Sequence, residues 1–193
     1  MATSDVQIVN LALTGIGAAR ILSLDDDQET ARKCKAVYEL IRYEVLASYP
    51  WKFALKKRAL ALLATAPLFG YTNAFQIPSD CLRIIATDID PTKWSREGDT
   101  IVTDESSIMI QYIYRITDPT KFSAGFVAAL SARLEAELAY PVSNNEKLAA
   151  SKFEVYSKIK LPLAKSLDAQ ENGDGATMNS DSFLDARSSG TIE

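Results

Sequence analysis

The chain has 193 residues, of which 47% are hydrophobic and 24% are charged, and its net charge at pH 7 is −4. This composition is typical of a globular protein, and the acidic balance argues against a general binder of nucleic acids or membrane surfaces. The chain contains no histidine, which removes the commonest general base and the usual zinc ligand. Composition therefore lowers the expectation of catalysis.

The sequence shows no targeting or membrane-spanning segment. The first residues lack the basic region and the apolar block of a signal peptide, and no apolar run approaches the roughly 20 residues that cross a bilayer. We therefore expect synthesis in the cytoplasm. Two cysteines do not make a disulfide framework, so Cys34 and Cys81 are expected to be buried free thiols.

Two helices are predicted in residues 4–50. Ser4 and Gln7 form a capping box for the first helix, and glycines near residue 15 offer its end. The second helix is expected over about residues 28–48, before Pro50. Apolar residues recur along one side of it at spacings of three and four, which predicts packing against other helices. They are Ala31, Cys34, Tyr38, Ile41 and Val45.

The next region, residues 51–117, is predicted to be rich in strands. A corner is expected at Pro78, because proline cannot continue a strand ladder. Short segments of strand-forming residues at regular intervals imply an antiparallel meander. These segments are 55–63, 71–77, 82–89, 100–103 and 108–116.

A third helix is predicted after residue 118. Asp118 is a candidate N-cap with Pro119 at the first helical position, although Ser123 competes for that role. Several alanines on this helix allow a close approach of neighbouring helices. Pro141 is expected to end it.

A fourth helix follows, for which Ser143 and Glu146 form a capping box. Pro162 predicts a kink in it. An apolar stripe is expected to pack against the other helices, and it consists of Ala149, Phe153, Tyr156, Ile159, Leu163 and Leu167. The polar segment that follows, residues 172–193, is predicted to be a flexible tail because it cannot bury enough of itself to fold alone.

These elements predict an α+β fold that is mainly helical. We expect a four-helix bundle with an antiparallel β insertion between the second and third helices and a flexible C-terminal tail. The bundle is assigned to residues 4–50 and 118–171, the β-rich insertion to 51–117, and the tail to 172–193.

No motif in the sequence predicts a catalytic, cofactor-binding or metal site. The run from Gly15 to Arg20 departs from the dinucleotide fingerprint and ends a helix, whereas the fingerprint follows a strand. The acidic residues 25–29 lack the glycine and glutamate that a calcium loop requires. Glu135 and Glu137 are two apart on a helix, so their side chains diverge. Residues 52–58 hold a concentration of basic side chains, which we interpret as a charged strand edge that discourages strand pairing.

The order of elements and several phrases together resemble the tail tubular protein A and related head-to-tail adaptor family of short-tailed bacteriophages. The resemblance spans most of residues 4–170. Phrases that carry it are Asn10-Leu-Ala-Leu-Thr-Gly-Ile-Gly17, Trp51-Lys-Phe-Ala54, Pro78-Ser-Asp-Cys-Leu-Arg83, Tyr112-Ile-Tyr-Arg-Ile-Thr-Asp118 and Asp181-Ser-Phe-Leu-Asp-Ala-Arg187.

This resemblance implies a structural virion protein, with no enzymatic activity and no cofactor. Such adaptors form a ring, usually of twelve subunits, between the portal protein and the distal tail (nozzle) protein. Genomic DNA passes through the ring without sequence recognition, and no membrane is involved. The protein would be made in the cytoplasm of the host bacterium and end in the virion. We expect Phe183, Leu184 and Arg187 to bind the portal or a neighbouring subunit.

Two alternatives from other classes stay open at the level of sequence. A histidine-free cell-wall hydrolase of the virion could use Glu97, Glu135 or Glu137 as an acid. A small DNA-packaging accessory protein would bind DNA through the basic residues 52–58, with an affinity that falls as salt rises.

Overall fold

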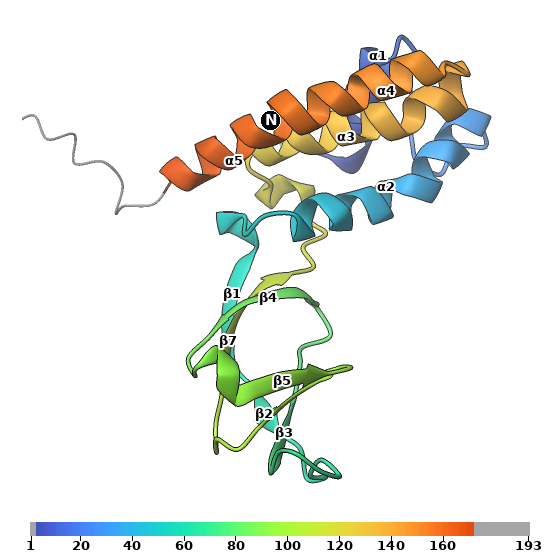
Figure 1. Cartoon of the computed structure of the whole chain (residues 1–193). Helices are drawn as coiled ribbons and strands as arrows, with labels where there is room; N and C mark the ends of the chain where they lie inside the picture. Colours follow the sequence, from blue (N-terminus) through green and yellow to red (C-terminus); the bar gives the residue numbers. More distant parts are fainter. Residues whose placement is uncertain (1–2, 172–193) are drawn as a thin grey trace, which may run out of the picture.

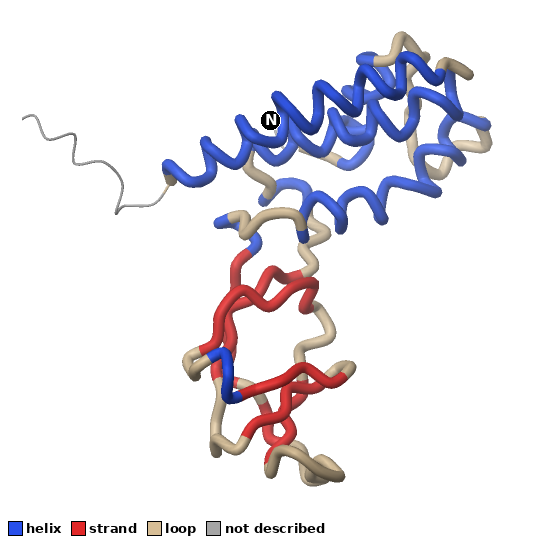
Figure 2. Tube along the Cα trace, viewed as in Figure 1, coloured by secondary structure: helices blue, strands red, loops and turns tan. Residues whose placement is uncertain are grey.

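The computed structural model describes residues 3–171 and confirms an α+β fold (Figure 1). The helices lie together in one body and the strands in a second body beside it, as the colouring of Figure 2 shows. The helices are α1 (Asp5–Gly15), α2 (Glu29–Ala47), α3 (Ala124–Ser143), α4 (Glu146–Val155) and α5 (Leu161–Gln170). The strands are β1 (Leu55–Ala59), β2 (Ala61–Leu62), β3 (Asn73–Gln76), β4 (Cys81–Thr87), β5 (Trp94–Glu97), β6 (Thr100–Thr103) and β7 (Met109–Tyr114).

Helix α3 lies at the centre of the helical body and packs against α1, α2, α4 and α5. Its alanines are largely buried, as expected of a helix that neighbours approach closely. At Gly125 an added Cβ atom would lie 3.4 Å from the Cα atom of Ala164, so α5 comes close to the backbone of α3 there.

Both predictions for the first two helices are confirmed. Ser4 and Gln7 form the capping box of α1, with Gln7 N donating to Ser4 Oγ at 3.2 Å. The predicted seam of α2 is buried throughout, including Cys34. Cys81, by contrast, is only half-buried, so the prediction of a buried thiol was wrong for that residue.

The predicted boundary between the third and fourth helices was wrong. Pro141 does not end α3, which continues to Ser143. A proline in the last turn removes one backbone donor, and the helix ends instead at Asn144, where φ is 52°. The cap of α4 is Asn145, which accepts a hydrogen bond from Leu148 N at 3.0 Å, so the proposed capping box at Ser143 does not form.

At the start of the third helix the structure resolves the competition between two caps. Ser123 caps α3, and its Oγ accepts from Phe126 N at 3.3 Å. Asp118 caps a separate short turn at Pro119–Lys121.

The fourth predicted helix is interrupted before Pro162 by a π-helical turn, Tyr156–Lys160, which separates α4 from α5. This turn shifts the inward-facing side of the helix by one residue. Tyr156 is buried, but the next buried positions are Ala164 and Asp168. The predicted packing stripe was therefore wrong beyond Tyr156, where Ile159, Leu163 and Leu167 face outward, and it was also wrong at Phe153, which is 50% exposed.

The strands do not form a meander. In the described residues they make a three-stranded antiparallel sheet in the order β1-β7-β4 and a four-stranded one in the order β2-β3-β6-β5. The first and last strands pair, with Leu55 opposite Ile113. The two faces of β7 contribute to different cores. Ile113 joins the helical core, whereas Ile110 and Tyr112 join a core between the sheets.

The corner at Pro78 is confirmed, and Asp80 fastens it to neighbouring strands. Cys81 N donates to Pro78 O at 2.9 Å. The carboxylate of Asp80 accepts from Lys56 Nζ at 3.1 Å and from the hydroxyl of Tyr112 at 3.2 Å. The corner therefore ties β4 to both β1 and β7.

Candidate interaction surfaces

The three carboxylates that the sequence offered for hydrolysis, Glu97, Glu135 and Glu137, each have different neighbours. Glu135 pairs with Lys152 at 2.8 Å, in the contact between α3 and α4. Glu137 pairs with Arg133, also at 2.8 Å, and Glu97 is exposed on β5. Most retaining and inverting glycoside hydrolases use two carboxyl groups that flank the bond they cleave. The structure does not bring these three side chains into such a pair.

Burial raises the pKa of Asp168 and of Cys34, two side chains that lie in the packed interior of the helical body. Burial raises the pKa of the Asp168 carboxyl, which accepts from Lys52 N at 3.1 Å and joins the end of α5 to the segment after α2. Burial also raises the pKa of the Cys34 thiol to about 11, which keeps it protonated and unreactive at neutral pH.

The acidic residues before α2 serve the local loop. Asp26 accepts from the backbone N–H groups of Leu22 and Ser23 at 3.1 and 3.0 Å. Asp25 pairs with Lys35 at 2.7 Å.

Within residues 3–171 no group of three or more Cys, Asp or Glu side chains is placed to hold a metal ion. In that same range no helix has the length and apolarity to span a membrane.

The first candidate surface is an apolar stripe on the outer side of the last helical segment. Ile159, Leu163 and Leu167 follow one another at a spacing of four, so they line one face. Their exposed fractions are 57%, 54% and 47%. Large apolar side chains gathered in this way mark a surface that another molecule covers.

The second candidate surface is the loop of residues 63–72, which lies at the end of the strand body away from the helices (Figure 1). At its tip Leu68 is 100% exposed and Phe69 is 86% exposed. The loop belongs to a longer stretch, residues 59–79, without a charged side chain. Its apolar tip has no partner among the described residues.

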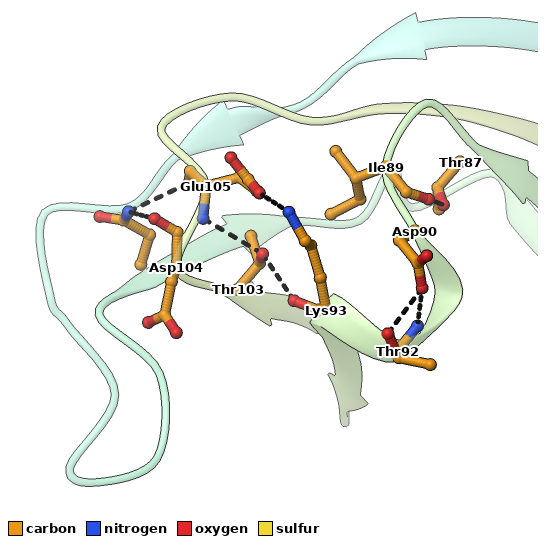
Figure 3. Close-up of polar contacts among 9 residues, drawn as sticks. Thr87, Ile89, Asp90, Thr92, Lys93, Thr103, Asp104 and Glu105 are labelled. Atoms are coloured by element: carbon orange, nitrogen blue, oxygen red, sulfur yellow. Dashed lines mark hydrogen bonds and ion pairs between the residues drawn. The ribbon is translucent and has the colours of Figure 1, made fainter.

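Polar contacts fix the C-terminal end of this loop. The carboxylate of Asp104 accepts from Thr72 N at 2.9 Å, and the side-chain amide of Asn73 donates to Glu105 O at 3.0 Å. Figure 3 shows how the network continues: Lys93 Nζ pairs with Glu105 at 3.0 Å, and Thr103 Oγ1 donates to the Lys93 carbonyl at 2.8 Å. The C-terminal end of the loop is thus tied to β5 and β6.

The third candidate surface is the basic strand β1 with a hollow beside it. The hollow of about 370 Å³ lies across β1, β7 and β4, and its lining includes Lys57, Arg58, Ala59, Asp88 and Met109. Lys56, by contrast, is already occupied, because it pairs with Asp80 and lies 3.7 Å from the centre of the Tyr114 ring.

The sequence singled out Phe183, Leu184 and Arg187 as partner-binding residues, and these lie outside the described residues. It missed the two apolar surfaces. The run without charges at 59–79 was a visible signal for the loop. The stripe gave no signal of exposure, because its spacing is the same as that of a buried helix face.

No protein-family model matches the chain, and no curated protein matches it.

Proposed function

We propose that this chain is a structural virion protein, a head-to-tail adaptor of a short-tailed bacteriophage. In this proposal its helices form a four-helix bundle that builds a ring, and the strands form an insertion between the second and third helices. The ring, of twelve subunits as in the family that the sequence resembles, lies between the portal protein and the distal tail protein. The assembled protein resides in the virion and needs no cofactor.

The observation that carries the proposal is the presence of separate apolar surfaces on two different elements. A ring is built from a heterologous contact, in which two unlike patches of each subunit meet. The stripe Ile159, Leu163 and Leu167 supplies one apolar patch on the helical body. Leu40 is a single exposed leucine of α2, a helix that Figure 1 shows on the other side of α3 from α4 and α5. The two sides could therefore meet between neighbouring subunits.

The loop tip of Leu68 and Phe69 suits a contact along the axis of the tail. It lies at the far end of the strand body, and its base is fixed by the network around Asp104 and Glu105. A loop whose end is held in place loses less conformational freedom on binding than a free segment does, which favours affinity. We assign it to the neighbouring subunit or to the distal tail protein.

The net charge of −4 also agrees with a conduit for DNA. A lining that attracted phosphate groups would retain the genome, whereas an acidic protein lets it pass. Neither alternative function gains support from a specific contact. The candidate carboxylates for hydrolysis are not paired with one another, and Lys56 of the basic strand is held by Asp80.

The experiment that tests the proposal is electron microscopy of the full chain mixed with the portal protein of the same virion. We expect rings stacked on the portal. Leu163→Asp should abolish the rings, whereas Leu22→Asp should leave them intact, because Leu22 is an isolated exposed residue in a loop. A variant without residues 173–193 should fail to bind the portal although the remaining chain stays folded, as circular dichroism measures. Absence of rings for the wild-type chain, or rings that tolerate Leu163→Asp, would overturn the proposal.

A further inference from the structure

Strand β1 has a free edge. In the sheet order β1-β7-β4 it pairs with β7 alone, so within residues 3–171 no strand is hydrogen-bonded to its other side. Near Ala59, residues 76–79 line a second hollow together with residues 58–61. The backbone groups on that side are available to an added strand. The side chain of Lys57 is available too, because no described acidic side chain lies within ion-pair distance of it, whereas Lys56 pairs with Asp80 and Arg58 contacts Tyr112. Such an edge rejects most strands but suits an acidic one.

The hollow beside this edge can hold an apolar side chain. Ala59 on β1 lies opposite Met109 on β7, and Met109 is an exposed apolar residue. The volume of about 370 Å³ is at the small end of ligand pockets. It fits one or two side chains better than a cofactor. The free edge thus has a basic position at Lys57 and, two residues along on the same face, an apolar one at Ala59.

The end of the last helix lies close to the start of this strand. The carboxylate of Asp168, near the end of α5, accepts from Lys52 N at 3.1 and 3.2 Å. Lys52 begins the short turn that leads into β1. The chain that follows residue 171 therefore starts beside the edge that it would have to reach.

The sequence of that following chain matches the edge. In an extended segment Asp181, Phe183 and Asp185 point to one face, alternating acid, aromatic, acid. From residue 171 to Phe183 the chain can span about 40 Å, whereas Lys52 to Ala59 requires about 23 Å. The segment can therefore reach the edge without strain.

We propose that residues 181–185 of the same chain bind along the free edge of β1 as an additional strand. Phe183 then lies over Ala59 and Met109, and an aspartate lies beside Lys57. The match holds for both strand directions, since Asp181 meets Lys57 in a parallel strand and Asp185 meets it in an antiparallel one. This contact within one chain does not depend on the adaptor role.

Hydrogen exchange of the β1 amides, measured by NMR on the full chain, tests this contact. Amides of residues 55–59 that point away from β7 exchange freely at an open edge and slowly under an added strand. We expect Phe183→Asp to speed their exchange about tenfold, equivalent to about 1.4 kcal/mol of docking. Ile192→Asp is the matched control, because it makes the same kind of change outside the segment, and it should leave exchange unchanged.

Charge reversal provides the second measurement. Lys57→Glu alone should also speed exchange, and combining it with Asp181→Lys and Asp185→Lys should restore protection. Equal exchange in the wild-type chain and in Phe183→Asp would overturn the proposal, as would failure of the charge-reversed combination to restore protection. Protection that rises with protein concentration would overturn it as well, because it would assign the added strand to a second copy.

Discussion

The two tryptophans of the chain differ in one decisive contact, and this difference yields a matched pair of substitutions. Trp51 is fully buried in the helical core, and its indole N–H donates to Val45 O at 2.9 Å. Its ring also contacts Phe126, with the ring centres 5.3 Å apart in an edge-to-face arrangement. Trp94 packs against the core between the sheets, and its buried indole N–H has no acceptor among the described residues.

The same change to phenylalanine should therefore have unequal costs. Trp51→Phe loses one hydrogen bond, about 1 kcal/mol, because the Val45 carbonyl keeps its bond from Ser48 Oγ at 2.8 Å. The smaller ring adds roughly 1–2 kcal/mol for lost aromatic contact and a small cavity. The total of about 2–3 kcal/mol corresponds to a fall in melting temperature of roughly 4–12 °C. Trp94→Phe removes a buried donor without a partner, so its effect should stay within about 1 kcal/mol.

Urea unfolding followed by tryptophan fluorescence measures both effects. The chain has only two tryptophans, so each variant leaves a single reporter. Trp94→Phe reports on the helical core through Trp51, and Trp51→Phe reports on the core between the sheets through Trp94. Equal destabilisation by the two substitutions, or a cost below about 1 kcal/mol for Trp51→Phe, would refute the reasoning.

The remaining predictions concern two buried titratable groups. Because burial raises the folded pKa of Asp168 above the unfolded value, its contribution to stability is full below about pH 3.8 and falls as pH rises through the folded pKa. Asp168→Asn should therefore be more stable than the wild-type chain at pH 7 but not at pH 3. Asp168→Ala should lose about 1–3 kcal/mol of stability, because Lys52 N loses its acceptor. Urea unfolding of both variants at pH 3 and pH 7 measures these differences. Cys34, with a pKa near 11, should react with a thiol reagent at pH 8 only as fast as the protein unfolds, and fast labelling would contradict its burial.

Helices and strands were predicted well where residues close in sequence determine them. The capping box at Ser4 and the seam of α2 depend on neighbours within one or two turns, and both formed as expected. Most strand segments were also placed within a few residues, because the turn residues between them punctuate the sequence. Pro141 was misread because the effect of a proline depends on whether its turn is the last one in the helix.

Features that depend on contacts between distant parts of the chain could not be predicted in this way. The π-helical turn before Pro162 adds a residue to one turn, and nothing in the apolar spacing records that shift. The pairing of β1 with β7 depends on which core each face of β7 enters, and this is decided by helices far away in the sequence. The exposed stripe and the free edge of β1 follow from these two features, so they became visible only in the structure, whereas the loop of residues 63–72 had a signal in the uncharged run 59–79.

The pairing of β1 with β7 also has a consequence for the order of folding. Closing Leu55 onto Ile113 brings together residues far apart in sequence, and the entropy lost in forming that loop is the main barrier to it. Once this pair has formed, only residues 48–54 and 114–123 separate α2 and α3 from it. Docking of these two helices then becomes nearly local. Weakening the β1–β7 ladder should therefore slow the collapse of the helical body as well as that of the sheets.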